Sequence, residues 1–462
     1  MVMFLRSDAR KEREKDRISE LPEPLIHHIF SFLFIKSIVS TSALSTKWRY
    51  TWTSTPIIDL CVCGTVEVIA FMRFVDRVLS FRQGVDSPPI KKFCLYSDYS
   101  FDQSRVYGWI SSVLEHKVEE LVLRGNTDII LPPCLFICES LTTLEISNGI
   151  TFKVPESVNF TNLKILRLSV KLEDEHSIPK LLSNSPILEE LGLDVLHGSV
   201  IQYLCIHSPN LKQLCIDGEL HDLDVQMNAP NVQSLKICST LAKDYVLHNF
   251  TALLDAEIFL SAETYLTLEE WEERFELGHL AIKLFASLSS VKCLQICDTC
   301  LMFLSHQDDL KTKLPLFYNL THLEVTRNFY NGYYGMGKGP SQIVRVLLDF
   351  LHISPNVESL VFDEGIVSDI NDCWSVDLIP QCLLLHLKSI EFCGLFWYQF
   401  EKDLVRFFLK NVKALQRVRI TIAENSEVAE NSNYKKIILD EISLFPRGSA
   451  DCLPHVSLDL FW

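Results

Sequence analysis

The chain has 462 residues, of which 48% are apolar and 22% are charged. This composition supplies enough apolar surface for a large buried core and excludes a wholly disordered chain. The 43 basic and 59 acidic side chains give a net charge of −16. That charge argues against nucleic acid and anionic membrane surfaces as partners, because both bind cationic proteins.

Residues 1–15 carry mixed charges, and we expect them to form a flexible tail. The segment 16–55 is predicted to be helical, because apolar residues recur in it at steps of three and four. In the first helix, where we expect them on one face, they are Leu21, Leu25, Ile26, Ile29, Phe30 and Leu33, and in the second Ile38, Val39, Ala43 and Leu44. Ser19 and Pro22 mark the helix start. So short a unit buries too little surface to be stable alone, so we expect it to share its core with a partner.

The motifs of this segment resemble the F-box family. The matching residues are Asp16-Arg17-Ile18-Ser19, Leu21-Pro22, Leu25, Ile29-Phe30-Ser31-Phe32-Leu33, Ser45, Trp48-Arg49 and Trp52. The resemblance implies docking on the adaptor subunit of an SCF-type ubiquitin ligase and, through it, on a cullin. The residues implied in adaptor binding are Leu21, Pro22, Leu25, Ile29, Leu33, Val39, Leu44, Trp48 and Trp52. Phe34 and Pro24 depart from the family pattern, where a proline and a polar residue respectively are common.

Behind this segment, residues 55–62 are predicted to form a short strand and residues 66–81 an amphipathic helix. The apolar residues that we expect on the inward face of this helix are Val68, Phe71, Met72, Val75 and Leu79.

One short phrase, apolar-x-x-apolar-x-apolar, then returns along most of the chain. Its copies begin at Ile90, Val118, Leu141, Leu163, Leu188, Leu211, Val232, Leu253, Val291, Leu320, Val357, Leu387 and Leu415. Between residues 118 and 232 the steps are 21 to 25 residues, a period typical of leucine-rich repeats. Residues 90–362 resemble that family, which implies an irregular solenoid over residues 56–372 in which each phrase is one strand of a curved parallel sheet.

A turn with a central proline precedes several of these phrases. Its copies are at Ser185-Pro186, Ser208-Pro209, Ala229-Pro230 and Ser354-Pro355. Helical patterns precede the first and the last of them, so the repeat unit is predicted to be helix, proline turn and strand, with the helices on the convex side.

Exposed strand positions and inserted loops are the expected contact surfaces for a target. We expect Glu119, Glu145, Arg167 and Lys212 on the concave face. A glutamate-rich helix over residues 269–285 and a loop of glycine and tyrosine over residues 328–339 occupy the two longest insertions, although a solvated surface is the simpler interpretation of the acidic helix.

The C-terminal segment 373–462 resembles the FBD domain of plant F-box proteins. The matching residues are Pro380-Gln381-Cys382-Leu383, Leu387-Lys388-Ser389-Ile390-Glu391 and Leu404-Val405-Arg406-Phe407-Phe408-Leu409-Lys410-Asn411. The pattern predicts strands over residues 387–392 and 415–421 and helices over residues 400–409 and 434–444. We expect this segment to cap the solenoid.

Two motifs have chemical alternatives. The glycine-rich stretch 332–339 lies in the context of a phosphate-binding loop, but Gly339 stands where a magnesium-binding Ser or Thr is required. Cys293, Cys297 and Cys300 lack a fourth zinc ligand in the sequence, and packing explains them more simply. We therefore predict no catalytic site, no cofactor and no metal.

The sequence thus predicts an α/β protein that acts as a non-catalytic substrate-recognition subunit of an SCF-type ubiquitin ligase. The alternative is a stand-alone leucine-rich-repeat scaffold that does not engage the ligase. No apolar run reaches the roughly 18 residues of a membrane span, and the 15 cysteines are typical of a reducing compartment. We expect an intracellular protein, in the nucleus, the cytoplasm or both, whose target the sequence does not identify.

Overall fold

The computed structural model describes residues 21–33, 35–43, 48, 51–62, 68–82, 89–97, 99, 101–125, 130–248, 250–261, 271–327, 343–363, 379–423, 434–449 and 454–459. The chain divides into two compact units, residues 1–150 and residues 151–462. In the described ranges, no helix combines the length and the apolar character that crossing a bilayer requires. The tail 1–15, Phe34, Leu44 and the inserted loop 328–339 lie outside them.

Unit 1 begins with short helices and continues as a parallel sheet. The helices are α1 (Glu23–Phe30), α2 (Ile35–Ser40), η1 (Thr41–Ala43) and η2 (Thr51–Ser54). The remaining elements are β1 (Ile57–Val62), α3 (Val68–Ser80), β2 (Lys92–Ser97), α4 (Gln103–Glu115), β3 (Glu120–Gly125), η3 (Pro133–Ile137) and β4 (Thr143–Phe152). The strands lie in chain order and pair in parallel. The predicted strand 55–62 and helix 66–81 are confirmed.

Helix α4 has no counterpart among the predicted elements. It begins where the Asp102 carboxylate accepts a hydrogen bond from the Arg105 N–H at 2.9 Å, an N-terminal cap of the common kind. Trp109 of α4 donates its indole N–H to Asp76 of α3 at 2.7 Å, and this bond joins α3 to α4.

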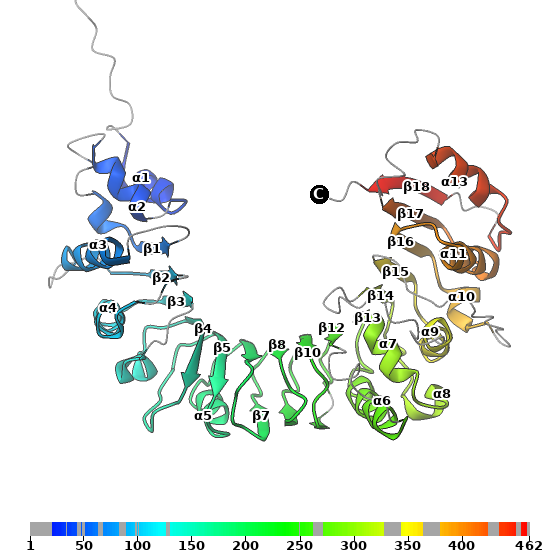
Figure 1. Ribbon diagram of the computed structural model, residues 1–462, viewed down its shortest axis with the longest axis horizontal. Helices are drawn as coiled ribbons and strands as arrows, with labels where there is room; N and C mark the ends of the chain where they lie inside the picture. The colour runs from blue at the N-terminus through cyan, green and yellow to red at the C-terminus, as the bar shows by residue number, and fades with distance from the viewer. Residues whose placement is uncertain are drawn as a thin grey trace, which may run out of the picture. The chain divides into compact units, whose positions relative to one another are not determined.

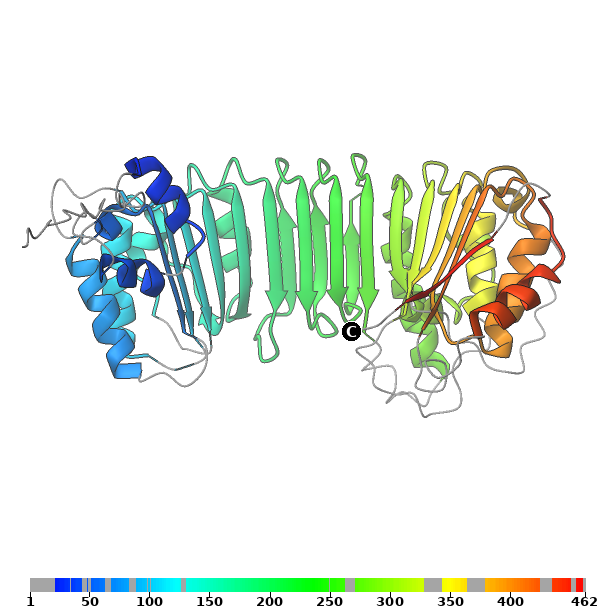
Figure 2. The same ribbon diagram turned by 90° about the horizontal axis from the view of Figure 1, so that it is seen from above.

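The main sheet of unit 2 carries the repeated phrase. Its strands, in spatial order, are β5 (Ile165–Leu172), β6 (Glu190–Val195), β8 (Gln213–Gly218), β10 (Ser234–Ser239), β12 (Asp255–Leu260), β13 (Cys293–Cys297), β14 (His322–Thr326), β15 (Ser359–Asp363), β16 (Ser389–Leu395), β17 (Arg417–Ala423) and β18 (Pro454–Asp459). In both units every predicted phrase forms a strand that starts two residues after the first apolar residue of the phrase. The strands run side by side and parallel (Figure 2), so the predicted sheet is confirmed.

Helices cover one face of this sheet in part (Figure 1). They are α5 (Ser177–Ser183), α6 (Trp271–Ala286), α7 (Asp298–Leu304), α8 (Leu310–Lys313), α9 (Ile343–His352), α10 (Gln381–Leu385), α11 (Gln399–Asn411) and α13 (Tyr434–Ser443). The predicted acidic helix 269–285 corresponds to α6, and the predicted helices 400–409 and 434–444 to α11 and α13.

The prediction that every repeat carries a helix on this side is wrong for the middle of unit 2. There a second sheet replaces the helices, with strands β7 (Tyr203–His207), β9 (Asp224–Asn228) and β11 (Asp244–Leu247). In β7 Leu204 and Ile206 are buried, and the residues on either side of each are more exposed. This period of two suits a strand, and a strand also fits the short connections better than a helix does.

The proline turns tie consecutive repeats together. The Asn210 side-chain amide donates to the backbone carbonyl of Pro186 at 2.7 Å, and Asn231 donates to the carbonyl of Pro209 at the same distance. In these two turns the asparagine therefore bonds to the proline of the turn before it, and Asn356 donates likewise to the carbonyl of Tyr318 at 2.8 Å. This contact explains why the Pro-Asn pair recurs in the sequence.

The C-terminal segment extends the sheet of unit 2. Strands β16, β17 and β18 continue in parallel from β15, and the Phe362 and Phe392 rings stack across the first of these junctions with centroids 5.0 Å apart. Strand β18 ends the sheet in the described residues and was not among the predicted elements. The segment thus adds further strands as well as the outer helices α11 and α13.

Candidate functional site

The apolar side of helix α1 consists of two adjacent stripes that differ in exposure. Ile26 and Phe30 are 0% exposed, whereas Leu25 and Ile29 are 50% and 41% exposed. The two pairs sit one position apart along the helix, so each spans one turn on its own side. The predicted apolar side of α1 is thus divided lengthwise, because one stripe packs into unit 1 and the other meets solvent.

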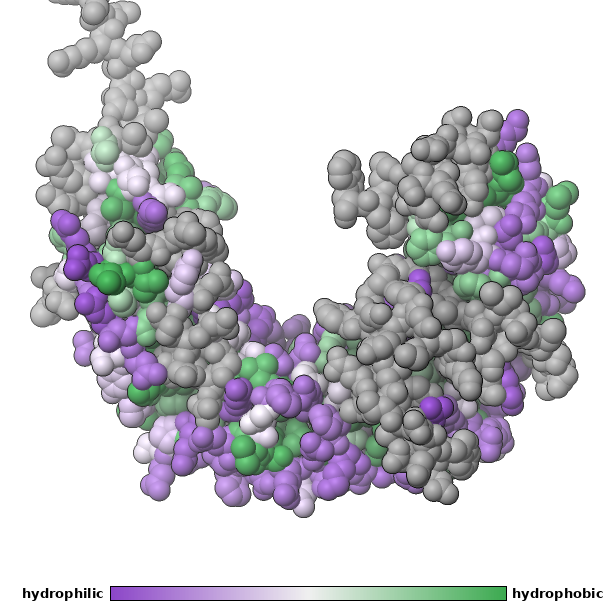
Figure 3. Space-filling model, viewed as in Figure 1, coloured by the Kyte–Doolittle hydropathy of each residue, from purple (hydrophilic) through white to green (hydrophobic). Residues whose placement is uncertain are grey.

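The exposed stripe continues beyond the end of the helix. Phe32 is 77% exposed and Leu33 is 38% exposed. Together with Leu25 and Ile29 they form a surface that we call the α1 face. Figure 3 shows hydrophobic residues on the part of unit 1 that carries α1 and α2. Exposed apolar side chains gathered in this way are typical of a protein-protein contact surface.

Phe32 is the member of the α1 face that the list of predicted contact residues omits. It comes three residues after Ile29, but α1 ends at Phe30, so Phe32 lies in the turn that follows the helix. Its ring packs edge-on against His28 with centroids 5.0 Å apart. The signal in the sequence that could have identified Phe32 was its position beside Leu33, in a segment that already had enough other apolar residues for its core.

The two tryptophans lie inside unit 1 rather than on its surface. Trp48 and Trp52 are 4% and 7% exposed. Trp48 meets Phe30 edge-on at 5.6 Å, and Trp52 meets Phe81 edge-on at 5.4 Å. Their predicted role as contact residues therefore needs correction, because in this structure the indole rings support the helices from within.

The other predicted contact residues take intermediate places. Leu21 and Val39 are half-buried, Pro22 is exposed, and Leu44 is outside the described residues. The Pro22 carbonyl accepts the N–H groups of Leu25 at 3.0 Å and Ile26 at 3.2 Å. Because Pro22 closes the first turn in this way, it fixes the start of α1 beside the α1 face.

A buried arginine holds the end of this helical segment to the sheet. The Arg82 guanidinium, 1% exposed, donates to the carbonyl of Thr55 at 2.6 Å and to that of Trp52 at 3.3 Å. Burial lowers the pKa of Arg82 to about 10. The carbonyl of Arg82 is 2.6 Å from His116 Nε2 on the segment after α4. These bonds fix the helical segment on the first repeats.

The face of the unit 2 sheet opposite the helices, which we call the open face, carries charged residues in matched pairs. Lys236 Nζ lies 2.6 Å from Glu257 on the next strand, and Arg419 lies 3.2 Å from Glu391. Arg167, which the sequence placed on this face, is there and pairs with Glu190 at 2.6 Å. Neighbouring strands are thus linked across the exposed positions.

Three of the predicted exposed strand residues need correction. Glu119 and Lys212 come one residue before β3 and β8, because the strand begins only after the turn that follows the first apolar residue. Glu145 lies on β4 but is 7% exposed, and it accepts a hydrogen bond from Arg124 at 2.5 Å.

Carboxylates on the open face are partly withdrawn from solvent. Burial raises the pKa of Asp217 above its ordinary value, and the nearby Asp194 adds to the effect. Burial also raises the pKa of Asp363, with a contribution from Glu324. Within the described residues, no three His, Cys, Asp or Glu side chains come together in a way that would hold a metal ion.

The cysteines considered as zinc ligands are divided between surface and core. Cys293 is exposed, whereas Cys297 and Cys300 are buried with sulfur atoms 3.5 Å apart. Cys297 Sγ accepts the Leu260 N–H at 3.2 Å, and Cys300 donates to the Ile258 carbonyl at 3.3 Å. The buried pair therefore joins α7 to strand β12. The glycine-rich stretch 332–339 lies outside the described residues.

Three family models match separate parts of the chain. A model of the F-box domain matches residues 18–60. A model described as the leucine-rich repeats of FBD-associated F-box protein At5g56370 matches residues 106–252. A model of the FBD domain matches residues 377–420.

Relatives from Arabidopsis thaliana are named for two or all three of these parts. F-box/LRR-repeat protein At4g14103 is 32% identical over 372 residues, covering 76% of this chain and 92% of its own length. FBD-associated F-box protein At1g66310 is 29% identical over 454 residues, covering 96% of both chains. Putative F-box/FBD/LRR-repeat protein At2g05300 is 28% identical over 454 residues, covering 95% of this chain and 96% of its own.

Proposed function

Because this chain belongs to the plant F-box/FBD/LRR-repeat family, we propose that it is the substrate-recognition subunit of an SCF-type ubiquitin ligase. In this proposal the F-box segment docks on the ligase adaptor, which connects it to the cullin, and the repeats bind a target protein. The chain supplies binding surfaces only, and the ubiquitin-transfer chemistry belongs to other subunits.

The α1 face is the observation that carries this proposal. Leu25, Ile29, Phe32 and Leu33 are all exposed on a small unit whose core is already filled by Ile26, Phe30 and Trp48. Fully burying one such side chain contributes roughly 1.5–3 kcal/mol. An adaptor that covers all four would therefore gain a substantial part of the free energy of a stable complex.

The open face of unit 2 is the proposed target surface. It offers matched charge pairs such as Lys236 with Glu257 on a sheet whose register fixes their spacing. Figure 3 shows hydrophilic and hydrophobic residues mixed over the visible part of unit 2. A surface of this kind favours a polar contact, and holding the target beside the ubiquitin carrier raises the effective concentration of its lysines.

Co-purification of the full chain with the SCF adaptor tests the docking step. We expect the wild type to bind with one-to-one stoichiometry and the double variant Leu25→Glu, Ile29→Glu to lose binding. The control variant is Ile69→Glu, because Ile69 is 60% exposed on α3 and lies outside the α1 face. It introduces the same kind of charge in unit 1 and should leave binding unchanged.

Because the substituted residues are exposed, we expect each variant to keep its fold, and circular dichroism of each variant checks this. A wild-type chain that is folded and does not bind the adaptor would overturn the proposal and favour a stand-alone repeat scaffold. Equal loss of binding in the Ile69→Glu control would remove the α1 face from the proposal.

A further inference from the structure

Two cysteines of unit 2 lie with their sulfur atoms in contact. Cys297 ends strand β13, and Cys300 follows three residues later in the first turn of α7. Both are 0% exposed, and their sulfur atoms are 3.5 Å apart. Residues three apart in a helical turn have Cα atoms roughly 5 Å apart, a separation that a disulfide bond spans. The two side chains are therefore placed to be joined by a disulfide.

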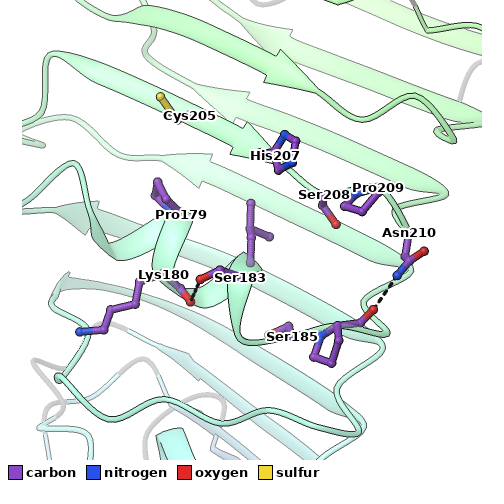
Figure 4. Close-up of a pocket in the computed structure, with 11 residues that line it drawn as sticks. Pro179, Lys180, Ser183, Ser185, Cys205, His207, Ser208, Pro209 and Asn210 are labelled. Atoms are coloured by element: carbon purple, nitrogen blue, oxygen red, sulfur yellow. Dashed lines mark hydrogen bonds between the residues drawn. The ribbon is translucent and has the colours of Figure 1, made fainter.

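Cys205 shows the contrasting case of a single cysteine in the same unit. It lies on β7 in the lining of a groove beside α5, and Figure 4 shows its sulfur apart from the other side chains drawn. The described lining of this groove holds no second cysteine. The Cys205 thiol donates instead to the Gln226 side chain of the next strand at 3.7 Å. A thiol placed in this way has no neighbour with which to form a disulfide.

The paired thiols bond to the backbone at the end of β12. The pairing of β12 with β13 ends at Ile258 and Ile296, although β12 continues to Leu260. Beyond that point Cys297 Sγ accepts the Leu260 N–H at 3.2 Å, and the Cys300 thiol donates to the Ile258 carbonyl at 3.3 Å. The sulfur atoms are thus held in place from the neighbouring strand as well as by α7.

The two thiols differ in how readily they ionise. Burial opposes a thiolate at both positions, but the neighbouring Cys300 thiol and the backbone of Leu260 stabilise one at Cys297 and lower the pKa of Cys297 below its ordinary value. Burial raises the pKa of Cys300 well above its ordinary value. The thiolate is the nucleophile in the oxidation of cysteine. Cys297 is therefore the sulfur that reacts first with an oxidant, and Cys300 the sulfur that reacts second.

We propose that Cys297 and Cys300 are a redox-active pair that hydrogen peroxide converts to a disulfide. The Cys297 thiolate attacks one peroxide oxygen, the O–O bond breaks, and the hydroxide that leaves takes up a proton to become water, which leaves a sulfenic acid at Cys297. The Cys300 sulfur then attacks the Cys297 sulfur. The S–S bond forms as the S–O bond breaks, and the second hydroxide leaves as water with the Cys300 proton. In all, two electrons pass from the two thiols to the peroxide.

Hydrogen peroxide is the oxidant that fits this site. It is close to water in size, so it reaches a buried pair through brief local openings of the fold. The disulfide exchanges the hydrogen bond from Cys300 to Ile258 for a covalent bond within the first turn of α7. A dithiol reductant restores the hydrogen bond. The site belongs to unit 2 and does not rest on the proposed function.

Peptide mapping by mass spectrometry tests whether the disulfide forms. The reduced, folded full chain is treated with hydrogen peroxide, quenched in denaturant with iodoacetamide and digested. We expect the disulfide between Cys297 and Cys300 to form at least about tenfold faster than Cys382 is oxidised, and dithiothreitol to reverse it. Cys382 is the internal control, because it is also 0% exposed and donates to the Leu351 carbonyl at 3.6 Å, but burial raises its pKa to about 12.

Three serine variants locate the pair and separate the roles of its members. Cys300→Ser should stop the reaction at a sulfenic acid on Cys297, which dimedone traps in denaturant, because a hydroxyl cannot displace the second water. Cys297→Ser should leave Cys300 reduced. Cys293→Ser is the matched control, because Cys293 is exposed on the same strand β13, and it should leave the disulfide unchanged.

Thermal unfolding of each variant establishes that the fold is retained, and the wild-type measurement remains a full test if a variant does not fold. The proposal is overturned if Cys297 and Cys300 are still reduced when Cys382 is oxidised, or if all three react together. It is equally overturned if the disulfide that forms joins Cys293 to either of them, or if Cys297→Ser and Cys300→Ser are oxidised alike.

Discussion

The Phe30 ring on α1 meets the Trp48 ring edge-on, with centroids 5.6 Å apart and an interplanar angle of 86°. Edge-on contact is a favourable geometry for two aromatic rings. Because both side chains are buried, this contact fixes how α1 is rotated about its axis. That rotation directs Leu25 and Ile29 outward, so an interior contact sets up the exterior face.

Substitution at this contact should affect stability, whereas substitution on the α1 face should not. We expect Trp48→Ala to lower the free energy of unfolding by about 3–5 kcal/mol, the usual cost of emptying a large aromatic site. Trp48→Phe should cost less, because the buried indole N–H has no hydrogen-bond partner in the described structure. Ile29→Glu should change stability by no more than about 0.5 kcal/mol. Urea unfolding measures all three, and similar losses for Trp48→Ala and Ile29→Glu would contradict the two-stripe arrangement.

Alanine substitutions at two glycines with positive φ should distinguish the cost of backbone strain from the cost of a steric collision. Gly198 has φ +87° and open space around its position, whereas Gly218 has φ +98° and a Cβ there would collide with the Val195 carbonyl oxygen. We expect Gly198→Ala to cost about 1 kcal/mol from strain alone and Gly218→Ala at least about 2 kcal/mol. Both lie in unit 2, so one urea titration compares them directly. Equal costs would show that the neighbouring repeat yields to the added methyl group.

The cysteines should differ sharply in how fast they are alkylated. Burial is the main cause that raises the pKa of Cys238 to about 12, with the nearby Asp217 adding to it, and burial raises that of Cys382 to about 12. At pH 8 each of these two thiols is then ionised to the reactive thiolate in only about one molecule in ten thousand. Exposed Cys134 should react with iodoacetamide first, as mass spectrometry of a time course would show. In urea the three should react at similar rates, and early labelling of Cys238 in the folded chain would count against this assignment.

Glu401 should make unit 2 less stable at neutral pH than at acid pH, relative to a glutamine at the same position. Burial raises the pKa of its carboxyl above the ordinary value, although the N–H of Tyr398, 2.8 Å away, lowers it in part. Because the folded pKa is higher than the unfolded one, protonation favours the folded state. The stabilisation is present below pH about 4.5 and is lost as the pH rises through the raised pKa.

The matching measurement compares urea midpoints of wild type and Glu401→Gln at pH 4 and pH 7. We expect the variant to gain stability relative to wild type as the pH increases, since glutamine has no charge to bury. Groups common to both proteins cancel in this difference. A relative gain at low pH instead would mean that the hydrogen bonds to the carboxylate outweigh its burial.

The strands of the main sheets were determined by the sequence itself. Leu166 and Leu168 of one phrase are buried, as are Leu191 and Leu193 of the next, and the register joins them in order. Because side chains alternate along a strand, only one face of each phrase is apolar enough to meet the core. A shift of the register by one residue would bury Arg167 instead of the leucines. The F-box, repeat and FBD motifs were readable for the same reason, since they are contiguous stretches of sequence.

Only the tertiary structure decided which side of each element meets a neighbour. The spacing of Leu25, Ile26, Ile29 and Phe30 is helical, but the position of Trp48 determines which two are covered. Likewise α5 and β7 each precede a similar proline turn, yet one is a helix and the other a strand. Local periodicity specifies an element and its apolar residues, whereas burial depends on side chains that arrive from distant parts of the chain.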